Sequence, residues 1–389
     1  MKVLILEDSD DKFEHIRETL QADINDCQVR RCSCISQFVS EVNKTEFDLV
    51  VTDLMVPLQA DSKNVINATE EIISEIRNID SLNFSTPVLA ITLFNDIATQ
   101  NYERFNRLDI TIINYSRDSN NWAEAFLLKA RKSIPQKTYD FVIFCALEKE
   151  ANAFKELDLQ VTGAFISNGL KCRSITINDM NGVIVVPPRM GLVNAAITCS
   201  KAIDVFNPRL ICMSGICAGI EGKANIYDVI ISDICHQHDS GKWCATGFVP
   251  EPYSVQIPHS TRMKIGGFLE ESDFIKTISD GIVLKKNEFP KHADTLDFDI
   301  KLAATSSGSS VVASGEALAS IKEQHRRMTS FEMESYGLYE AARQAGRELI
   351  YFSAKSVVDN GDESKSDDFH RVACLLSAKT VCELIKKIF

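Results

Sequence analysis

The stretch KVLILEDSDDKFEHIRETL, residues 2–20, decides how the first part of the chain folds. It opens with a short apolar run that ends in the acids Glu7 and Asp8. A helical repeat follows, in which Phe13, Ile16 and Leu20 fall on one face. The stretch therefore predicts a strand, a turn that carries two carboxylates, and an amphipathic helix.

Further apolar runs along the chain also end in a polar residue. Asp53 ends the run in FDLVVTD, and Thr92 ends the run in TPVLAIT. A further strand at 110–114 and a helix at 121–133 complete an alternating β/α series. Such alternation predicts a doubly wound parallel sheet, whose ligands lie at the carboxyl ends of the strands. The residues at these predicted strand ends are Glu7, Asp8, Asp53 and Thr92.

Residues 1–132 resemble a two-component receiver domain, which has the flavodoxin-like fold. The resemblance implies that Asp53 is the phosphoacceptor of an upstream sensor histidine kinase and that Thr92 is the switch hydroxyl. It also implies that Glu7, Asp8 and Asp53 together hold Mg²⁺, an ion that prefers oxygen ligands.

The chain departs from the receiver pattern at the end of the last predicted strand. Receivers carry a lysine there, whereas this chain has Asn114 or Tyr115 in the stretch IINYSRD. Arg117 is the candidate substitute for the missing cation. A degenerate receiver that serves only as a docking module stays open as an alternative.

A second domain is expected from Tyr139 to the end of the chain, 139–389, after a polar linker at 133–138. Its apolar runs end in ALEKE (146–150), in SGICAGI, which contains Gly215, and in SVVDNGD (356–362). Glycine at a strand end lets a ligand approach the backbone closely. The stretch FEMES carries Glu332 and Glu334, which also suit the start of a helix because the helix dipole favours acids there.

The order of these segments resembles the purine nucleoside phosphorylase and methylthioadenosine/S-adenosylhomocysteine nucleosidase superfamily. The resemblance implies an α/β domain with a mixed central sheet that acts without a cofactor. It assigns Glu150 to the activation of water and Asp359 to protonation of the purine. Met333 and Glu334 would grip the ribose, and Glu332 would support that clamp.

The chemistry of N-glycosidic cleavage suits three carboxylates in three roles. The ribose becomes positively charged while the base leaves with negative charge. A carboxyl group can protonate the base at N7, and a second carboxylate can deprotonate water. A third, near the ribose hydroxyls, binds more strongly as the sugar becomes cationic.

The resemblance also favours hydrolysis over phosphorolysis. Phosphorylases of this superfamily hold phosphate with arginines near the first strand and in the glycine-rich strand, whereas ALEKEANAF and ICMSGICAG contain no arginine. A set of cations in other loops would suit a substrate with a polyphosphate. These predicted substrate-binding residues are Arg189, His238, Lys242 and Arg326, beside Gly215.

The fusion resembles the nucleosidase effectors of the Detocs antiphage defence system, which remove adenine from ATP. It implies a phosphorylation-gated ATP nucleosidase. A homo-oligomer is expected because members of the nucleosidase superfamily associate, and the cysteines indicate a cytoplasmic protein. The alternatives are a nucleosidase for methylthioadenosine, S-adenosylhomocysteine or another purine nucleoside, a phosphorylase, and a nucleotide-binding module without catalysis.

Composition restricts the partners. The 389 residues carry a formal net charge of −12, which argues against a nucleic-acid partner because phosphate backbones bind basic surfaces. The apolar runs are too short to cross a bilayer, so no membrane partner is expected. The twelve scattered cysteines are expected to be reduced and mostly buried, as in cytosolic proteins.

Overall fold

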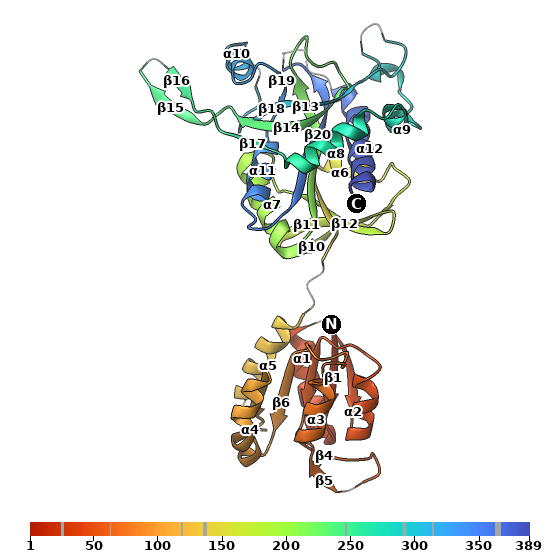
Figure 1. The fold of residues 1–389 in the computed structure, drawn as a ribbon, viewed down its shortest axis with the longest axis vertical. Coiled ribbons are helices and arrows are strands. Elements are labelled where there is room, and N and C mark those ends of the chain that lie inside the picture. Colours follow the sequence, from red (N-terminus) through yellow and green to blue (C-terminus); the bar gives the residue numbers. More distant parts are fainter. Residues whose placement is uncertain are drawn as a thin grey trace. The chain divides into compact units, whose positions relative to one another are not determined.

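The computed structural model describes residues 1–24, 27–62, 64–117, 120–134, 138–245, 247–290, 293–312, 315–361 and 367–389. The chain divides into two compact units, residues 1–136 and 137–389 (Figure 1). The predicted linker at 133–138 lies partly outside the described residues.

The first unit alternates strands and helices along the chain. Its strands are β1 (Lys2–Leu6), β2 (Gln28–Cys32), β3 (Leu49–Thr52), β4 (Met55–Pro57), β5 (Val65–Asn67), β6 (Val88–Thr92) and β7 (Ile110–Asn114). Its helices are α1 (Asp10–Asp23), α2 (Ile35–Val42), α3 (Thr69–Ile76), α4 (Asn95–Arg107) and α5 (Asn121–Lys132).

Five of these strands form one parallel sheet in the order β2-β1-β3-β6-β7. Apolar side chains of α1 and α5 pack on one face, and those of α2, α3 and α4 pack on the other. The predicted doubly wound parallel sheet is therefore present. Because parallel strands end at the same edge, Glu7, Asp53 and Thr92 come together at the carboxyl edge of β1, β3 and β6.

The second unit is larger and is built around a mixed sheet. Its strands are β8 (Phe141–Phe144), β9 (Gln160–Val161), β10 (Phe165–Ser167), β11 (Leu170–Ile177), β12 (Met180–Val186), β13 (Leu210–Gly219), β14 (Val229–Gln237), β15 (Gly241–Cys244), β16 (Gly247–Pro250), β17 (Ser254–Gln256), β18 (Ile300–Ser307), β19 (Met328–Glu332) and β20 (Ile350–Asp359). Its helices are α6 (Glu148–Ala153), α7 (Leu192–Phe206), α8 (His259–Leu269), α9 (Phe274–Ser279), α10 (Gly315–Glu323), α11 (Ser335–Arg343) and α12 (His370–Ile388), with short 3₁₀ turns at Lys286–Glu288 and Asp367–Phe369.

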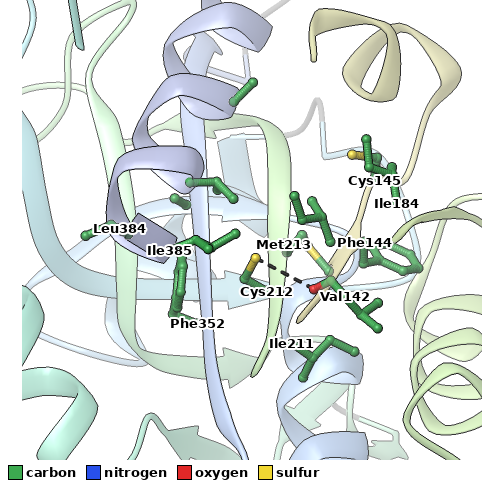
Figure 2. Packing of buried hydrophobic residues seen from close by; sticks show 14 of the residues in the cluster. Val142, Phe144, Cys145, Ile184, Ile211, Cys212, Met213, Phe352, Leu384 and Ile385 are labelled. Atoms are coloured by element: carbon green, nitrogen blue, oxygen red, sulfur yellow. Dashed lines mark hydrogen bonds between the residues drawn. The ribbon is translucent and has the colours of Figure 1, made fainter. Parts of the chain in front are cut away.

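The central strands of this sheet run in both directions. Strand β13 is parallel to β8 and β20 and antiparallel to β19, and β20 also pairs antiparallel with β14. Figure 2 shows Val142 and Phe144 of β8, Cys212 of β13 and Phe352 of β20 in the core, with Ile385 of α12 over them. The predicted mixed sheet is confirmed, and its buried centre fixes the strand ends that carry the candidate site.

Two further findings concern the cysteines and the length and composition of the helices. All twelve cysteines are free thiols, and all but Cys27 and Cys244 are buried, as predicted. Among the described helices, none combines the length and the apolar composition that a membrane span needs.

Candidate active site

A cavity of about 180 Å³ opens at the ends of the central strands of the second unit. Its wall is formed by the residues after β8, by the ends of β13, β19 and β20, and by the start of α12. Five of the predicted site residues line it: Glu150, Glu332, Met333, Glu334 and Asp359. Segments nearly 210 residues apart in sequence thus meet at one small space.

Glu150 is held in a fixed orientation at the base of this cavity. One carboxylate oxygen accepts the N–H of Leu147 at 3.0 Å, and the other accepts the N–H of Ile216 at 3.1 Å. A Cβ atom at Gly215 would lie 2.5 Å from the carboxylate, so glycine is needed there for close approach. Gly215 is not among the residues that line the cavity, and its predicted contact with a ligand stays a prediction.

Glu332 and Glu334 occupy different positions although they are two residues apart. Glu332 is the last residue of β19, and its carboxylate accepts the N–H groups of Glu334 and Ser335 at 2.9 and 3.0 Å. Glu334 stands just before α11 and accepts the N–H of Gly191 at 3.0 Å. Glu332 therefore caps the helix start, while Glu334 ties the loop before α7 to the cavity.

A buried lysine joins these two acids. The Nζ atom of Lys355, on β20, lies 2.5 Å from Glu332 and 2.8 Å from Glu334. Burial opposes the charge on Glu332, but the ammonium of Lys355 and the hydrogen bonds from Ser307 and the N–H of Glu334 together hold the pKa of Glu332 below its usual range. Burial likewise opposes the charge on Lys355, yet Glu332, Glu334 and Glu150 raise its pKa well above the usual value. The group is a mutually stabilised ion cluster.

Glu150 differs from its neighbours because no ion pair reaches it among the described residues. Burial raises the pKa of Glu150 to about 7, and the charge of Lys355 only partly opposes this rise. A carboxylate with a pKa near neutrality can exchange a proton with water under physiological conditions. Glu150 is thus suited to serve as a general base.

Asp359 and Met333 complete the acid-lined side of the cavity. Asp359 is the last residue of β20 and accepts the N–H of Gly361 at 2.7 Å. It is half-buried, so its carboxyl faces both protein and cavity. Met333 is also half-buried, between Glu332 and Glu334.

The predicted polyphosphate-binding cations do not line this cavity. Arg189, Lys242 and Arg326 are exposed, and the Nδ1 atom of His238 pairs with the hydroxyl of Ser306 at 3.0 Å. Part of the cavity wall is instead apolar, with Met190, Val311, Val312 and Phe331. Binding of a polyphosphate by Arg189, His238, Lys242 and Arg326 stays a prediction.

The first unit has a carboxylate cluster of its own. Oxygen atoms of Glu7, Asp8 and Asp53 all lie within 4.8 Å of one another. Glu7 and Asp53 are buried, and Asp8 is exposed. Burial raises the pKa of Glu7 to about 7. Thr92 is fully buried at the end of β6, and its hydroxyl accepts the N–H of Phe94 at 3.3 Å.

Lys12 lies in the middle of this cluster. Its Nζ atom donates to Asp53 at 2.5 Å and to the carbonyl of Ile91 at 2.8 Å. The Nζ atom also lies 2.7 Å from Oε2 of Glu7 and forms an ion pair with it, but the geometry of this contact is not that of a hydrogen bond. Arg117, the predicted substitute cation, is instead exposed and lies 3.7 Å from Asp11.

Both buried lysines were missed from the sequence, although each leaves a signal there. Lys355 is the one charged residue inside the strand IYFSAKSVVD before its terminal acid. Lys12 lies four and eight residues before Ile16 and Leu20, on the buried face of α1. A charge at a position that the periodicity assigns to the core indicates a buried partner.

Comparisons with known proteins agree with the fold of the second unit. Residues 140–389 match the family model of the phosphorylase superfamily. An uncharacterized protein, y4jS, of Sinorhizobium fredii is 24% identical and aligns with all of this chain and 99% of its own length. ATP nucleosidase Cap17 of Escherichia coli is 24% identical over 65% of this chain, which spans about half, 52%, of Cap17.

A solved structure supports the same fold. The 5′-methylthioadenosine/S-adenosylhomocysteine nucleosidase of Helicobacter pylori superposes with a TM-score of 0.50 at 16% identity. The superposed region covers 64% of this chain and 99% of the nucleosidase. With the family model matched over most of the chain, the protein belongs to the phosphorylase superfamily.

Proposed function

We propose that the second unit hydrolyses the N-glycosidic bond of ATP and related adenine nucleotides, and releases adenine and ribose 5′-triphosphate. The chain is an enzyme of the nucleosidase class, as its named relatives are. The observation that carries the proposal is the meeting of Glu150, Glu334 and Asp359 at one cavity. The similarity to an ATP nucleosidase supports ATP as the substrate.

Each acid has a role that its surroundings support. Glu150, with a pKa of about 7, takes a proton from the attacking water. Glu334, fixed by Gly191 and Lys355, accepts hydrogen bonds from the ribose hydroxyls, which strengthen as the sugar becomes cationic. Asp359 gives a proton to N7 of the departing purine. Met333 packs against the sugar.

A second substrate class is favoured by the apolar wall of the cavity. Met190, Val311 and Val312 line it, and Val311 is exposed enough to contact a ligand. A thioether or another uncharged 5′ group would fit such a wall better than a triphosphate. A methylthioadenosine or S-adenosylhomocysteine nucleosidase is therefore the second candidate.

The first unit is proposed as a receiver that controls this activity. Asp53, at the end of β3, would accept a phosphoryl group from a sensor histidine kinase. The carboxylate oxygens of Glu7, Asp8 and Asp53 are of the kind that Mg²⁺ prefers, and that ion would neutralise a phosphoryl group. The fit is incomplete, because Lys12 already contacts Glu7 and Asp53. We propose that the protein forms a homo-oligomer and that it degrades ATP during phage infection.

One assay separates these possibilities. The purified full chain is incubated with ATP, AMP, adenosine or 5′-methylthioadenosine, with and without a small-molecule phosphoryl donor, and free adenine is measured. We expect adenine from ATP, and more of it with the donor. Asp53→Asn should abolish the effect of the donor. Adenine from 5′-methylthioadenosine alone would favour the second candidate, and no adenine from any substrate would refute the proposal.

A further inference from the structure

Lys12 engages each of the two buried acids at the carboxyl edge of the first unit. Its side chain is 1% exposed, and its Nζ atom contacts Asp53, Glu7 and the carbonyl of Ile91 within 2.8 Å. The other oxygen of Asp53 accepts the N–H of Leu54 at 2.6 Å. Both oxygens of Asp53 are therefore already in use, one by the ammonium and one by the backbone.

A divalent cation cannot use the same oxygens while Lys12 stays where it is. Mg²⁺ would lie about 2.0–2.1 Å from its ligands, which places it against an ammonium that contacts the same pair of oxygens. Two cations at such a separation repel strongly where water is excluded. The acids alone fit the ion, but the acids together with Lys12 do not.

We propose that Lys12 is a resident cation of this cluster. It takes the place of the metal ion, and it also takes the place of the strand-end lysine, where β7 ends in Asn114. A divalent cation reaches Glu7 and Asp53 only when the ammonium moves away. The inference rests on the proposed receiver role of the first unit and names the residue that controls access to it.

The position of Lys12 also couples the cluster to a group of rings. Its Nζ atom lies 5.5 Å from the ring centroid of Tyr115, whose hydroxyl pairs with Nδ1 of His15 at 2.9 Å. The ring of Tyr115 lies 5.2 Å from that of Trp122, which is 2% exposed. Displacement of Lys12 would therefore change the surroundings of Trp122, and fluorescence can report it.

The first test measures binding of Mg²⁺ alone to the full chain. Trp243→Phe removes the exposed second tryptophan, so Trp122 is the remaining fluorophore. Calorimetry and Trp122 fluorescence then compare Lys12→Met with Arg117→Met, which removes an exposed cation from the same unit. We expect Lys12→Met to bind Mg²⁺ about tenfold tighter or more, because the competing charge is gone. Arg117→Met should match the parent.

Equal or weaker binding by folded Lys12→Met would overturn the proposal. So would binding by Lys12→Met that survives the added change Asp53→Asn, because the ion would then lie elsewhere. If Lys12→Met does not fold, Lys12→Gln, which keeps a polar group near Ile91, replaces it in the binding measurement.

The second test needs no variant of Lys12. An amine-acylating reagent and mass spectrometry measure how fast Lys12 reacts in the parent, where burial should protect it. We expect saturating Mg²⁺ to raise this rate several-fold. Bound Mg²⁺ with Lys12 still protected would overturn the proposal. Both tests are independent of adenine release, so failure of the proposed hydrolysis would leave their results unchanged.

Discussion

In the described part of each unit, one lysine is buried against a pair of acids at the ends of the strands. In the first unit, Lys12 comes from a helix and contacts Glu7 and Asp53. In the second, Lys355 comes from the central strand β20 and contacts Glu332 and Glu334. The same device thus neutralises acids that would be costly to bury alone.

The two clusters differ in the acid that is not ion-paired with the lysine. In the first cluster this acid is Asp8, which is exposed. In the second it is Glu150, which is 2% exposed; in the described part of the chain, the hydrogen bonds to its carboxylate come from backbone N–H groups alone. Its pKa therefore rises to about 7, whereas that of Glu332 falls. Within the second unit, the acid that is ion-paired with the lysine has a lowered pKa and the buried acid outside that pair has a raised pKa. In the first unit the lysine does not suffice, because burial raises the pKa of Glu7 to about 7 although Lys12 lies beside it.

The most direct way to break this comparison is Glu150→Gln. If Glu150 is the general base, the rate of adenine release should fall by about 10²–10⁴-fold. Adenine release is measured with ATP and with 5′-methylthioadenosine, and circular dichroism checks the fold. Glu148→Gln is the matched control, because Glu148 lies on the same helix but pairs with Lys171 and Arg173. A rate unchanged by Glu150→Gln would contradict the assignment.

Removal of Lys355 tests whether the ion cluster stabilises the fold of the second unit. Lys355→Met leaves Glu332 and Glu334 buried without their cation, and should lower the free energy of unfolding by about 3–5 kcal/mol. Urea unfolding followed by circular dichroism measures the change. The control Lys386→Met removes one partner of the surface pair with Glu383, worth about 0–1 kcal/mol. Similar losses in both variants would show that Lys355 is not the centre of an ion cluster.

The backbone beneath Glu150 gives a smaller effect. In Gly215→Ala the new Cβ atom would meet the carboxylate at 2.5 Å, so the side chain must shift. We expect a loss of about 1–3 kcal/mol in the free energy of unfolding, together with slower adenine release. Gly267→Ala, on α8, meets no atom within 4 Å and should keep both properties. Normal activity in Gly215→Ala would mean that the exact position of Glu150 is unimportant.

The sequence predicted much of the architecture, because strand and helix periodicity is local. The alternation around Glu7 and Asp53 indicated the parallel sheet, and the stretches with Glu150, Glu334 and Asp359 indicated strand ends that the structure brings to one cavity. The insertion of β20 between β13 and β14 follows from long-range pairing that no local pattern reports.

The partners of buried charges were the part that sequence did not predict. Arg117 was the expected cation of the first unit, and proximity in sequence to the last strand suggested it. The structure instead uses Lys12, which is far from that strand in sequence but near its end in space. The positions of the exposed cations Arg189, Lys242 and Arg326 could not be predicted either, because they depend on how the rest of the chain packs.

The pH dependence of the two kinds of acid gives a further test. Burial raises the pKa of Glu150 from 4.5 to about 7, so below that pH the carboxyl gains a proton and cannot accept one from water. The rate of adenine release should fall about tenfold per pH unit there. Glu150→Gln should abolish that limb, and a limb that persists would assign it to another group.

Stability should respond to pH with opposite signs at the two acids. The folded state holds the proton of Glu150 more tightly than the unfolded state, so this group loses stabilising effect as the pH rises from 4.5 towards 7. The lowered pKa of Glu332 gives stability that is present above its unfolded pKa and is lost as the pH falls through its folded pKa. Urea midpoints of the parent and of Glu150→Gln across pH 4–8 measure the difference. Between pH 5 and 7 the parent should lose stability relative to Glu150→Gln, because the glutamine side chain has no proton to release. Parallel midpoints throughout would mean that Glu150 is ionised in the folded chain, and the contrast between a paired and an unpaired buried acid would then fail at its central residue.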